Sequence, residues 1–194
     1  KRNLTEINSG ISVMTIKKIL EDHLKKNPKS LLRYGYKVFS QHDEDGIIDE
    51  ILNRVKISNK RFVELGLEDG LECNTANLLF QGWDGLWIES KKNYVNSIKK
   101  NYKKYLLNNL KVVEAKVSPT NINELLNKNL KSKKIGLLSI DIGFHTFDVL
   151  NAIDTIEPDI IVTEYNSKYG PKIEWKVDYD ESKDWDGTDN YGAS

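Results

Sequence analysis

The chain has 194 residues, a length that suits one domain with a full hydrophobic core and is short for two. Its 29 basic and 29 acidic residues give a formal net charge of zero, so the overall charge makes no case for nucleic-acid binding. The single cysteine, Cys73, excludes an internal disulfide and a cysteine-cluster zinc site, and it suits a reducing compartment. The longest apolar runs have only strand length and no signal peptide is present, so we expect a cytoplasmic protein without a membrane span.

Residues 1–58 predict a helical cap on the domain that follows. Between residues 11 and 24 hydrophobic side chains recur at helical spacing, and Pro28 ends the pattern. A second helix is predicted over residues 43–55, with acidic residues in its first turn, where the helix dipole stabilises negative charge.

Residues 59–171 predict the core of the fold, because short apolar runs alternate there with segments of helical periodicity. The runs span residues 60–66, 84–90, 110–117, 134–142 and 158–166, and the intervening helices span 72–81, 91–105, 121–130 and 146–155. This alternation is typical of a mostly parallel sheet with helices on both faces, the Rossmann-like α/β class. Residues 172–194 are polar, acidic and rich in Trp and Tyr, and we expect them to form a surface tail or lid of the same single domain.

The loop after the first predicted strand is the first place to look for a ligand, since open parallel sheets bind ligands beyond the carboxyl ends of their strands. This loop reads ELGLEDGL over residues 64–71. A dinucleotide fingerprint, G-x-G-x-x-G, has glycines where this chain has Glu68 and Leu71. A carboxylate beside a pyrophosphate is repulsive, so NAD and FAD are disfavoured.

The same loop instead suits a cofactor that has an amino-acid tail and no phosphate. Glu64 is suited to accept a hydrogen bond from an ammonium group, while Gly66 and Gly70 let the backbone pass close to the ligand. Glu89 ends the second predicted strand, where a carboxylate is well placed to bind ribose hydroxyls. Together these features favour S-adenosylmethionine.

Five stretches of the chain share a wider pattern: FSQHDEDGIIDEIL, FVELGLEDGLECNTANLLFQGWDGLWIES, LLSIDI, VTEYNSKYGP and WDGTDNYGAS. From about residue 39 to its end the chain resembles the FkbM-like S-adenosylmethionine-dependent methyltransferases of bacterial surface-polysaccharide (capsule and lipopolysaccharide) gene clusters. The resemblance implies a Rossmann-like class I methyltransferase that acts on a hydroxyl of a sugar or a nucleotide-linked sugar. The residues that it assigns to the cofactor site are Gln41, Glu64, Gly66, Gly70, Asn74, Glu89, Ser90 and Asp141.

One segment departs from that family. Its members continue the fourth strand as SIDIDGND, whereas this chain reads SIDIGFHTFD. Asp141 is kept, and the residues that replace the rest of the motif are Gly143, Phe144, His145 and Thr146. The change implies either a different substrate or a loss of activity.

The predicted strand ends offer few groups for methyl transfer to a hydroxyl, a reaction in which the oxygen loses its proton as it attacks. His145 is the preferred general base, because the ordinary pKa of histidine suits proton removal near neutrality. The alternative is a surface histidine in a loop. Asp141 lies four residues earlier, at the end of the fourth predicted strand, and is the second candidate catalytic residue. These strand ends also suit a magnesium site, because hard oxygen ligands are offered by Asp141, Glu164 and Asn166. In the alternative, Asp141 contacts the methionine tail of the cofactor and Glu164 caps a loop.

The tail carries four aromatic residues among its carboxylates, namely Trp175, Tyr179, Trp185 and Tyr191. They either stack on a sugar substrate or pack the tail onto the sheet. The sequence therefore favours a methyltransferase that uses S-adenosylmethionine and a small sugar or nucleotide-sugar acceptor. Two alternatives stay open: a catalytically inactive cofactor-binding relative with a scaffold role, and an NAD-dependent or nucleotide-sugar enzyme on a similar sheet.

Overall fold

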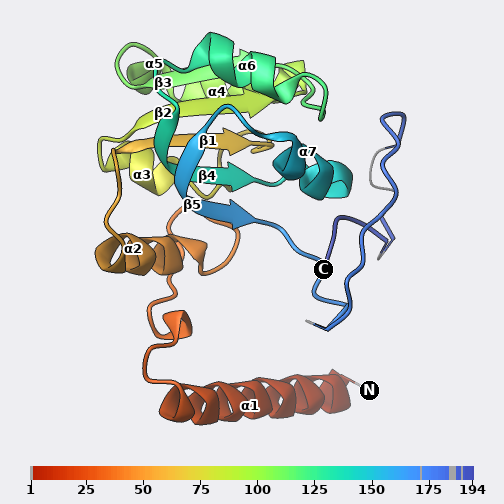
Figure 1. Ribbon diagram of the computed structural model, residues 1–194. Helices are drawn as coiled ribbons and strands as arrows, with labels where there is room; N and C mark the ends of the chain where they lie inside the picture. Colours follow the sequence, from red (N-terminus) through yellow and green to blue (C-terminus); the bar gives the residue numbers. More distant parts are fainter. Residues whose placement is uncertain (1, 171, 184–186, 189) are drawn as a thin grey trace.

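The computed structural model describes residues 2–170, 172–183, 187–188 and 190–194, with side chains from residue 14 onward. Its centre is a five-stranded parallel sheet in the order β3-β2-β1-β4-β5 (Figure 1). The strands are β1 (Arg61–Leu65), β2 (Asp84–Glu89), β3 (Leu110–Glu114), β4 (Lys134–Ile140) and β5 (Glu157–Thr163). Each overlaps an apolar run of the sequence, so the predicted α/β class is confirmed.

Helices cover both faces of the sheet, as predicted. The helices of the core are α2 (Glu44–Arg54), α3 (Ala76–Phe80), α4 (Lys92–Asn101), α5 (Lys103–Leu106), α6 (Ile122–Asn129) and α7 (Thr146–Ala152). On one face Trp87 of β2 packs with Leu79 of α3 and Ile98 of α4, and on the other Ile140 of β4 packs with Leu126 of α6. Because both faces are covered, the strands are apolar without strict alternation.

The N-terminal region differs from the expected cap. The helix α1 (Arg2–Lys26) forms, but it lies apart from the sheet (Figure 1). Its side chains Met14, Ile16 and Ile19 are 74, 64 and 64 % exposed. After a short turn, η1 (Leu31–Arg33), only α2 packs on the sheet, where Ile48 is buried. Of the helices in the described residues, none combines the length and the apolar character needed to cross a membrane.

The tail folds back beside β5 and α7 (Figure 1). Its two ends pair through an antiparallel bridge between Lys176 and Ala193, and the main-chain N–H of Asn166 donates to the oxygen of Ala193 at 2.7 Å. Trp175 stacks on Tyr169 with ring centroids 4.5 Å apart. These contacts favour the packing role of the tail aromatics, although Trp185 lies outside the described residues.

Candidate cofactor site at the carboxyl edge of the sheet

The strand order reverses between β1 and β4, and ligands of open α/β sheets bind beyond the carboxyl ends of the strands at such a point. In the register of the sheet Leu65 pairs with Ile88 and with Ile140, and Ile140 pairs with Thr163. The next residue on each strand therefore stands in one row along the carboxyl edge. That row consists of Gly66, Glu89, Asp141 and Glu164, four of the residues that the sequence predicts for the site.

Gly66 is where the loops after β1 and β4 meet. Its φ is +72°, and a Cβ atom added there would lie 2.0 Å from the main-chain oxygen of Asp141. Only glycine fits this contact and this conformation. The sequence analysis expected Gly66 to let a ligand come close to the backbone. The structure adds that Gly66 is needed because the loop after β4 packs against it.

Glu64 is almost fully buried, with 1 % of its surface exposed. Its Oε1 accepts from the main-chain N–H of Asn74 at 2.9 Å and from the hydroxyl of Ser139 at 3.3 Å. Its Oε2 accepts from the main-chain N–H and the hydroxyl of Thr75, at 3.2 and 2.5 Å. Burial raises the pKa of Glu64, and these four hydrogen bonds act in the opposite direction.

These contacts give Glu64 a different role from the one expected of it. A carboxylate offers about four acceptor positions, and four donors already occupy them. No acceptor is left for an ammonium group. Glu64 instead fixes the loop between β1 and α3, together with Asn74, whose side-chain amide donates to the Ser139 hydroxyl at 3.1 Å.

Glu89 joins the loops that follow β1 and β2. Its Oε2 accepts from the main-chain N–H groups of Leu67 and Glu68, at 3.3 and 3.0 Å. Its Oε1 accepts from the N–H of Lys91 at 2.8 Å and from the hydroxyl of Ser90 at 3.2 Å. Because the Ser90 hydroxyl is exposed and free to rotate toward water, one acceptor position of Glu89 can pass to a ligand hydroxyl.

The rest of the loop after β1 is shaped by two residues with positive φ. Glu68, with φ of +51°, adopts the left-handed conformation at the position where a dinucleotide fingerprint has its second glycine. Its side chain is exposed. Gly70 is buried, with φ of +78°, and its oxygen accepts from the Tyr102 hydroxyl at 2.6 Å. Gly70 thus anchors the loop to α4 rather than opening it to a ligand.

Asp141 and Glu164 form a hydrogen-bonded pair of carboxyls on neighbouring strand ends. Loss of hydration raises the pKa of both, and it brings that of Glu164 to about 7 with the help of the negative charge and the hydrogen bond of Asp141. The nearby charge of Glu68 also raises the pKa of Asp141. Below about pH 7 Glu164 is therefore the protonated partner of the pair and donates its hydrogen bond to Asp141.

The predicted metal site is not supported by the positions of its ligands. Asn166 is buried, its amide donates to the main-chain oxygen of Tyr191 at 3.1 Å, and its Oδ1 accepts from the N–H of Lys168 at 3.1 Å. It therefore holds the tail, and the pair of Asp141 and Glu164 lacks its third ligand. Within the described residues, no three His, Cys, Asp or Glu side chains are grouped to hold a metal ion.

His145 lies in the short turn η2 (Gly143–His145), under the tail. Its Nε2 donates to the main-chain oxygen of Asp180 at 2.8 Å, because a carbonyl only accepts, and its ring lies 4.7 Å from that of Tyr179. The Nδ1 atom is buried and, in the described part of the chain, has no partner. The predicted general base therefore has one ring nitrogen bonded to the tail and the other buried, so neither nitrogen is open to a substrate hydroxyl in this conformation.

The segment that departs from the family pattern is the docking surface of the tail. Besides His145, Asp148 binds Lys176 with N and O 2.9 Å apart, and the Lys176 ammonium lies 5.6 Å from the ring centre of Phe147. The sequence contained a signal for this packing, since both the segment 143–148 and the tail are rich in aromatic residues. It did not reveal that they meet.

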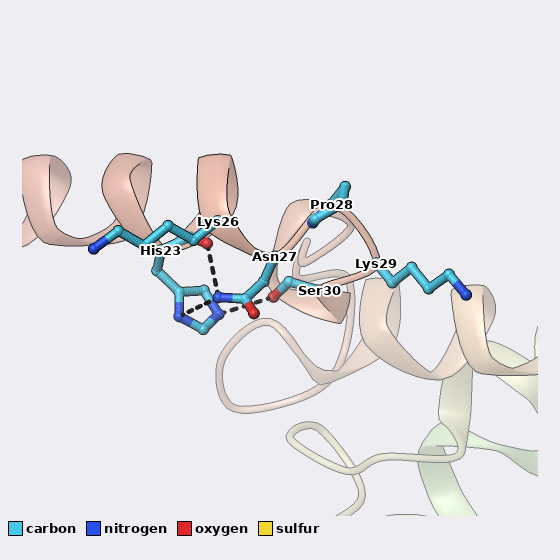
Figure 2. A pocket seen from close by; sticks show the side chains of 6 residues that line it. All are labelled: His23, Lys26, Asn27, Pro28, Lys29 and Ser30. Atoms are coloured by element: carbon cyan, nitrogen blue, oxygen red, sulfur yellow. Dashed lines mark hydrogen bonds between the residues drawn. The ribbon is translucent and has the colours of Figure 1, made fainter.

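Two hollows lie elsewhere on the protein. One, of about 480 Å³, is lined by His23 and by residues 26–30 at the end of α1, where His23 is within hydrogen-bonding distance of Asn27 and Ser30 (Figure 2). The other, of about 320 Å³, lies near the amino ends of β1, β2 and β3, and Arg61, Asp84 and Lys111 are among its lining residues. Both are remote from the row of strand-end residues.

No protein-family model matches the chain, and no curated protein matches it in sequence. Among solved structures, a candidate caffeoyl-CoA O-methyltransferase from Staphylococcus aureus superposes with a TM-score of 0.51 at 14 % identity, over 80 % of this chain and 76 % of that one. Together with the sheet order, this likeness identifies the fold. The chain has the Rossmann-like fold of class I methyltransferases.

Two further solved structures are similar at lower scores. The Podospora anserina methyltransferase PaMTH1, with S-adenosylhomocysteine bound, has a TM-score of 0.48 at 16 % identity, over 78 % of this chain and 70 % of that one. Precorrin-6y C5,15-methyltransferase from Geobacter metallireducens has a TM-score of 0.44 at 18 % identity, over 66 % of this chain. This chain spans 64 % of the Geobacter chain, slightly less than two thirds.

Proposed function

We propose that this protein is an S-adenosylmethionine-dependent methyltransferase. The observation that carries the proposal is the position of Glu89 at the carboxyl end of β2, the strand beside β1, where it accepts from the main-chain N–H groups of Leu67 and Glu68. A carboxylate in this place is suited to a ribose diol, and the loop that it holds borders the crevice where ligands of open α/β sheets bind.

The charges at the carboxyl edge support this cofactor over a dinucleotide. Glu68 and Glu164 each lie within electrostatic range of Asp141. Carboxylates stabilise the ammonium and sulfonium charges of S-adenosylmethionine, and they repel a pyrophosphate. When bound, the cofactor supplies an electrophilic methyl group, and the protein has to bind the acceptor beside it and take up the acceptor's proton.

We place the acceptor near the pair of Asp141 and Glu164. An ionised carboxylate there accepts a hydrogen bond from an acceptor hydroxyl and receives its proton, and the pKa of Glu164, about 7, is matched to that task. The acceptor class is a sugar or nucleotide-linked sugar hydroxyl destined for a surface polysaccharide. This class rests on the sequence resemblance described above.

The test is a calorimetric titration of S-adenosylhomocysteine and, separately, NAD into the wild-type protein and the variants Glu89→Ala and Glu114→Ala. Glu114 ends β3 opposite Glu89 in the sheet register and is exposed, so it is a matched control. We expect micromolar binding of S-adenosylhomocysteine, weakened about tenfold or more by Glu89→Ala and unchanged by Glu114→Ala. Binding of NAD instead would overturn the proposal. Sugar acceptors are then screened for methylation, with and without Mg²⁺.

An inactive cofactor-binding relative is the second candidate. The observation that favours it is the shielding of His145 by the tail, in the segment that departs from the family pattern. If the protein is such a relative, we expect S-adenosylhomocysteine to bind in a way that depends on Glu89. We also expect no methyl transfer to any acceptor and no slow hydrolysis of S-adenosylmethionine.

A further inference from the structure

Asp45, on the first turn of α2, is a second buried carboxylate outside the row of strand ends that, like Glu64, accepts four hydrogen bonds. One oxygen, Oδ2, accepts from three consecutive main-chain N–H groups, those of Val38, Phe39 and Ser40, at 2.7, 2.7 and 2.8 Å. The same oxygen accepts from the Ser40 hydroxyl at 2.9 Å. Asp45 is 1 % exposed, and in the described part of the chain its other oxygen, Oδ1, has no partner.

The segment that Asp45 holds, residues 38–40, is also fixed from the other side. The main-chain N–H of Cys73 donates to the oxygen of Phe39 at 3.1 Å, and the ring of Phe39 stacks on Phe80 of α3 with centroids 4.8 Å apart. The Lys37 ammonium bridges Glu72 at 3.1 Å and the main-chain oxygen of Gln41 at 3.0 Å. The segment therefore lies along the loop that follows β1, and its conformation is fixed on both sides.

Gln41 is the first residue after this fixed segment. Its side chain is exposed and, among the described residues, its amide makes no hydrogen bond. Three residues later the charge of Glu44 acts on Asp141, so the start of α2 stands within electrostatic range of the strand-end row. An unengaged amide beside the cofactor loop is available to a ligand, whereas Asp45 itself is enclosed.

We infer that Asp45 is a positioning residue for the cofactor site, which acts by fixing the main chain of residues 38–40 so that the amide of Gln41 faces the bound cofactor. The inference rests on the proposed function. The charge of Asp45 matters because three N–H donors converge on one oxygen, and hydrogen bonds to an ionised acceptor are about twice as strong as neutral ones. An asparagine would lose that charge and place an amide N–H₂ where Oδ1 has no partner.

The experiment measures the Kd of S-adenosylhomocysteine by calorimetry for Asp45→Asn, Gln41→Ala, the double variant and the control Asp49→Asn. Asp49 is on the same helix but binds Tyr36 and Gln81 instead. We expect Asp45→Asn and Gln41→Ala each to raise the Kd about tenfold, the double variant to match Gln41→Ala alone, and Asp49→Asn to stay within about twofold of wild type.

Each outcome has one meaning. If the wild-type protein does not bind S-adenosylhomocysteine, the proposed function fails, and this inference fails with it. If the wild type binds but Asp45→Asn only lowers the melting temperature, or if the effects of the two variants multiply, Asp45 does not act through Gln41 and the inference is overturned. Should Asp45→Asn not fold, Ser40→Ala removes one of the four donors and is expected to raise the Kd about threefold in the same non-additive way.

Discussion

The substitution Glu64→Gln tests whether the loop between β1 and α3 is held by an ionised carboxylate. Four donors converge on Glu64, and two of them are main-chain N–H groups that have no freedom to turn away. The hydroxyl of Thr75 is also committed, because its oxygen already accepts from the Trp87 indole at 2.8 Å and its hydrogen points to Glu64. The Ser139 hydroxyl is held in the same way, because its oxygen accepts from the Asn74 amide at 3.1 Å while its hydrogen points to Glu64.

In either orientation, the glutamine amide therefore faces at least one main-chain N–H. An unsatisfied buried donor costs roughly 1–3 kcal/mol, and the remaining hydrogen bonds lose their charge assistance, whereas the neutral side chain regains part of the cost of burying a charge. We expect a net loss of about 2–4 kcal/mol in the free energy of unfolding, or roughly 4–16 °C in melting temperature for a chain of this length. Urea and thermal denaturation at pH 7.5 measure both.

The matched control is Ser139→Ala, which removes the longest of the four hydrogen bonds to Glu64, at 3.3 Å, and should cost no more than about 1 kcal/mol. If Glu64→Gln is as stable as wild type, Glu64 is protonated in the folded protein and the reasoning about the loop is refuted. Binding of S-adenosylhomocysteine should weaken along with stability, since this loop borders the proposed site.

Three further predictions concern Gly66, Glu164 and His145. Gly66→Ala should cost roughly 3–5 kcal/mol in unfolding free energy, because the new Cβ overlaps a main-chain oxygen as well as straining φ, whereas Gly82→Ala, with similar φ and open space around it, should cost only about 1–2 kcal/mol. The folded-state pKa of Glu164, about 7, lies above its ordinary value of 4.5, so this group's contribution to stability is complete below about pH 4.5 and is lost as the pH rises through 7. Relative to Glu164→Gln, the wild type should lose on the order of 1 kcal/mol or less of unfolding free energy between pH 5 and pH 8, measured by urea titration. Its preference for S-adenosylmethionine over S-adenosylhomocysteine, whose sulfur is uncharged, should increase over the same pH range. A flat pH profile in either measurement would refute the corresponding prediction. His145→Ala should accelerate tryptic cleavage in the tail roughly fivefold without a large change in melting temperature, and an unchanged cleavage rate would show that His145 does not hold the tail.

The sheet was predictable because its information is local. Each strand is a short apolar run bounded by polar residues, and burial on both faces removes the alternation that would suggest another class. The same local reading placed Glu89 and Asp141 at strand ends, and the parallel register then aligned them. The separation of α1 from the sheet was not predictable, since helical spacing shows that a helix forms but not that another element covers it.

The roles of the carboxylates were not predictable because their partners are distant in sequence. Glu64 receives hydrogen bonds from residues 10, 11 and 75 positions away, and His145 meets a main-chain oxygen 35 positions away. Asp45 lay in a segment that the sequence presented as an acidic first turn, typically a solvent-exposed position, yet it is buried. The residues that organise the site without having been predicted are Asp45, Thr75 and Ser139.

Counting occupied acceptor positions separates the carboxylates that fix the protein from those available to a ligand. Glu64 has four donors on its two oxygens, and Asp45 has four on Oδ2 while its Oδ1 is buried, so neither has a position that a ligand can reach. Asp141 and Glu164 instead face each other and share a proton, an arrangement that a cation or an acceptor hydroxyl is able to replace. Glu89 is intermediate, because only its Ser90 contact is readily exchanged. Removing a carboxylate that fixes the protein should lower both stability and ligand affinity. Removing a carboxylate that is available to a ligand should lower affinity alone. Plotting the loss of stability against the loss of affinity for variants of all five carboxylates therefore tests this division.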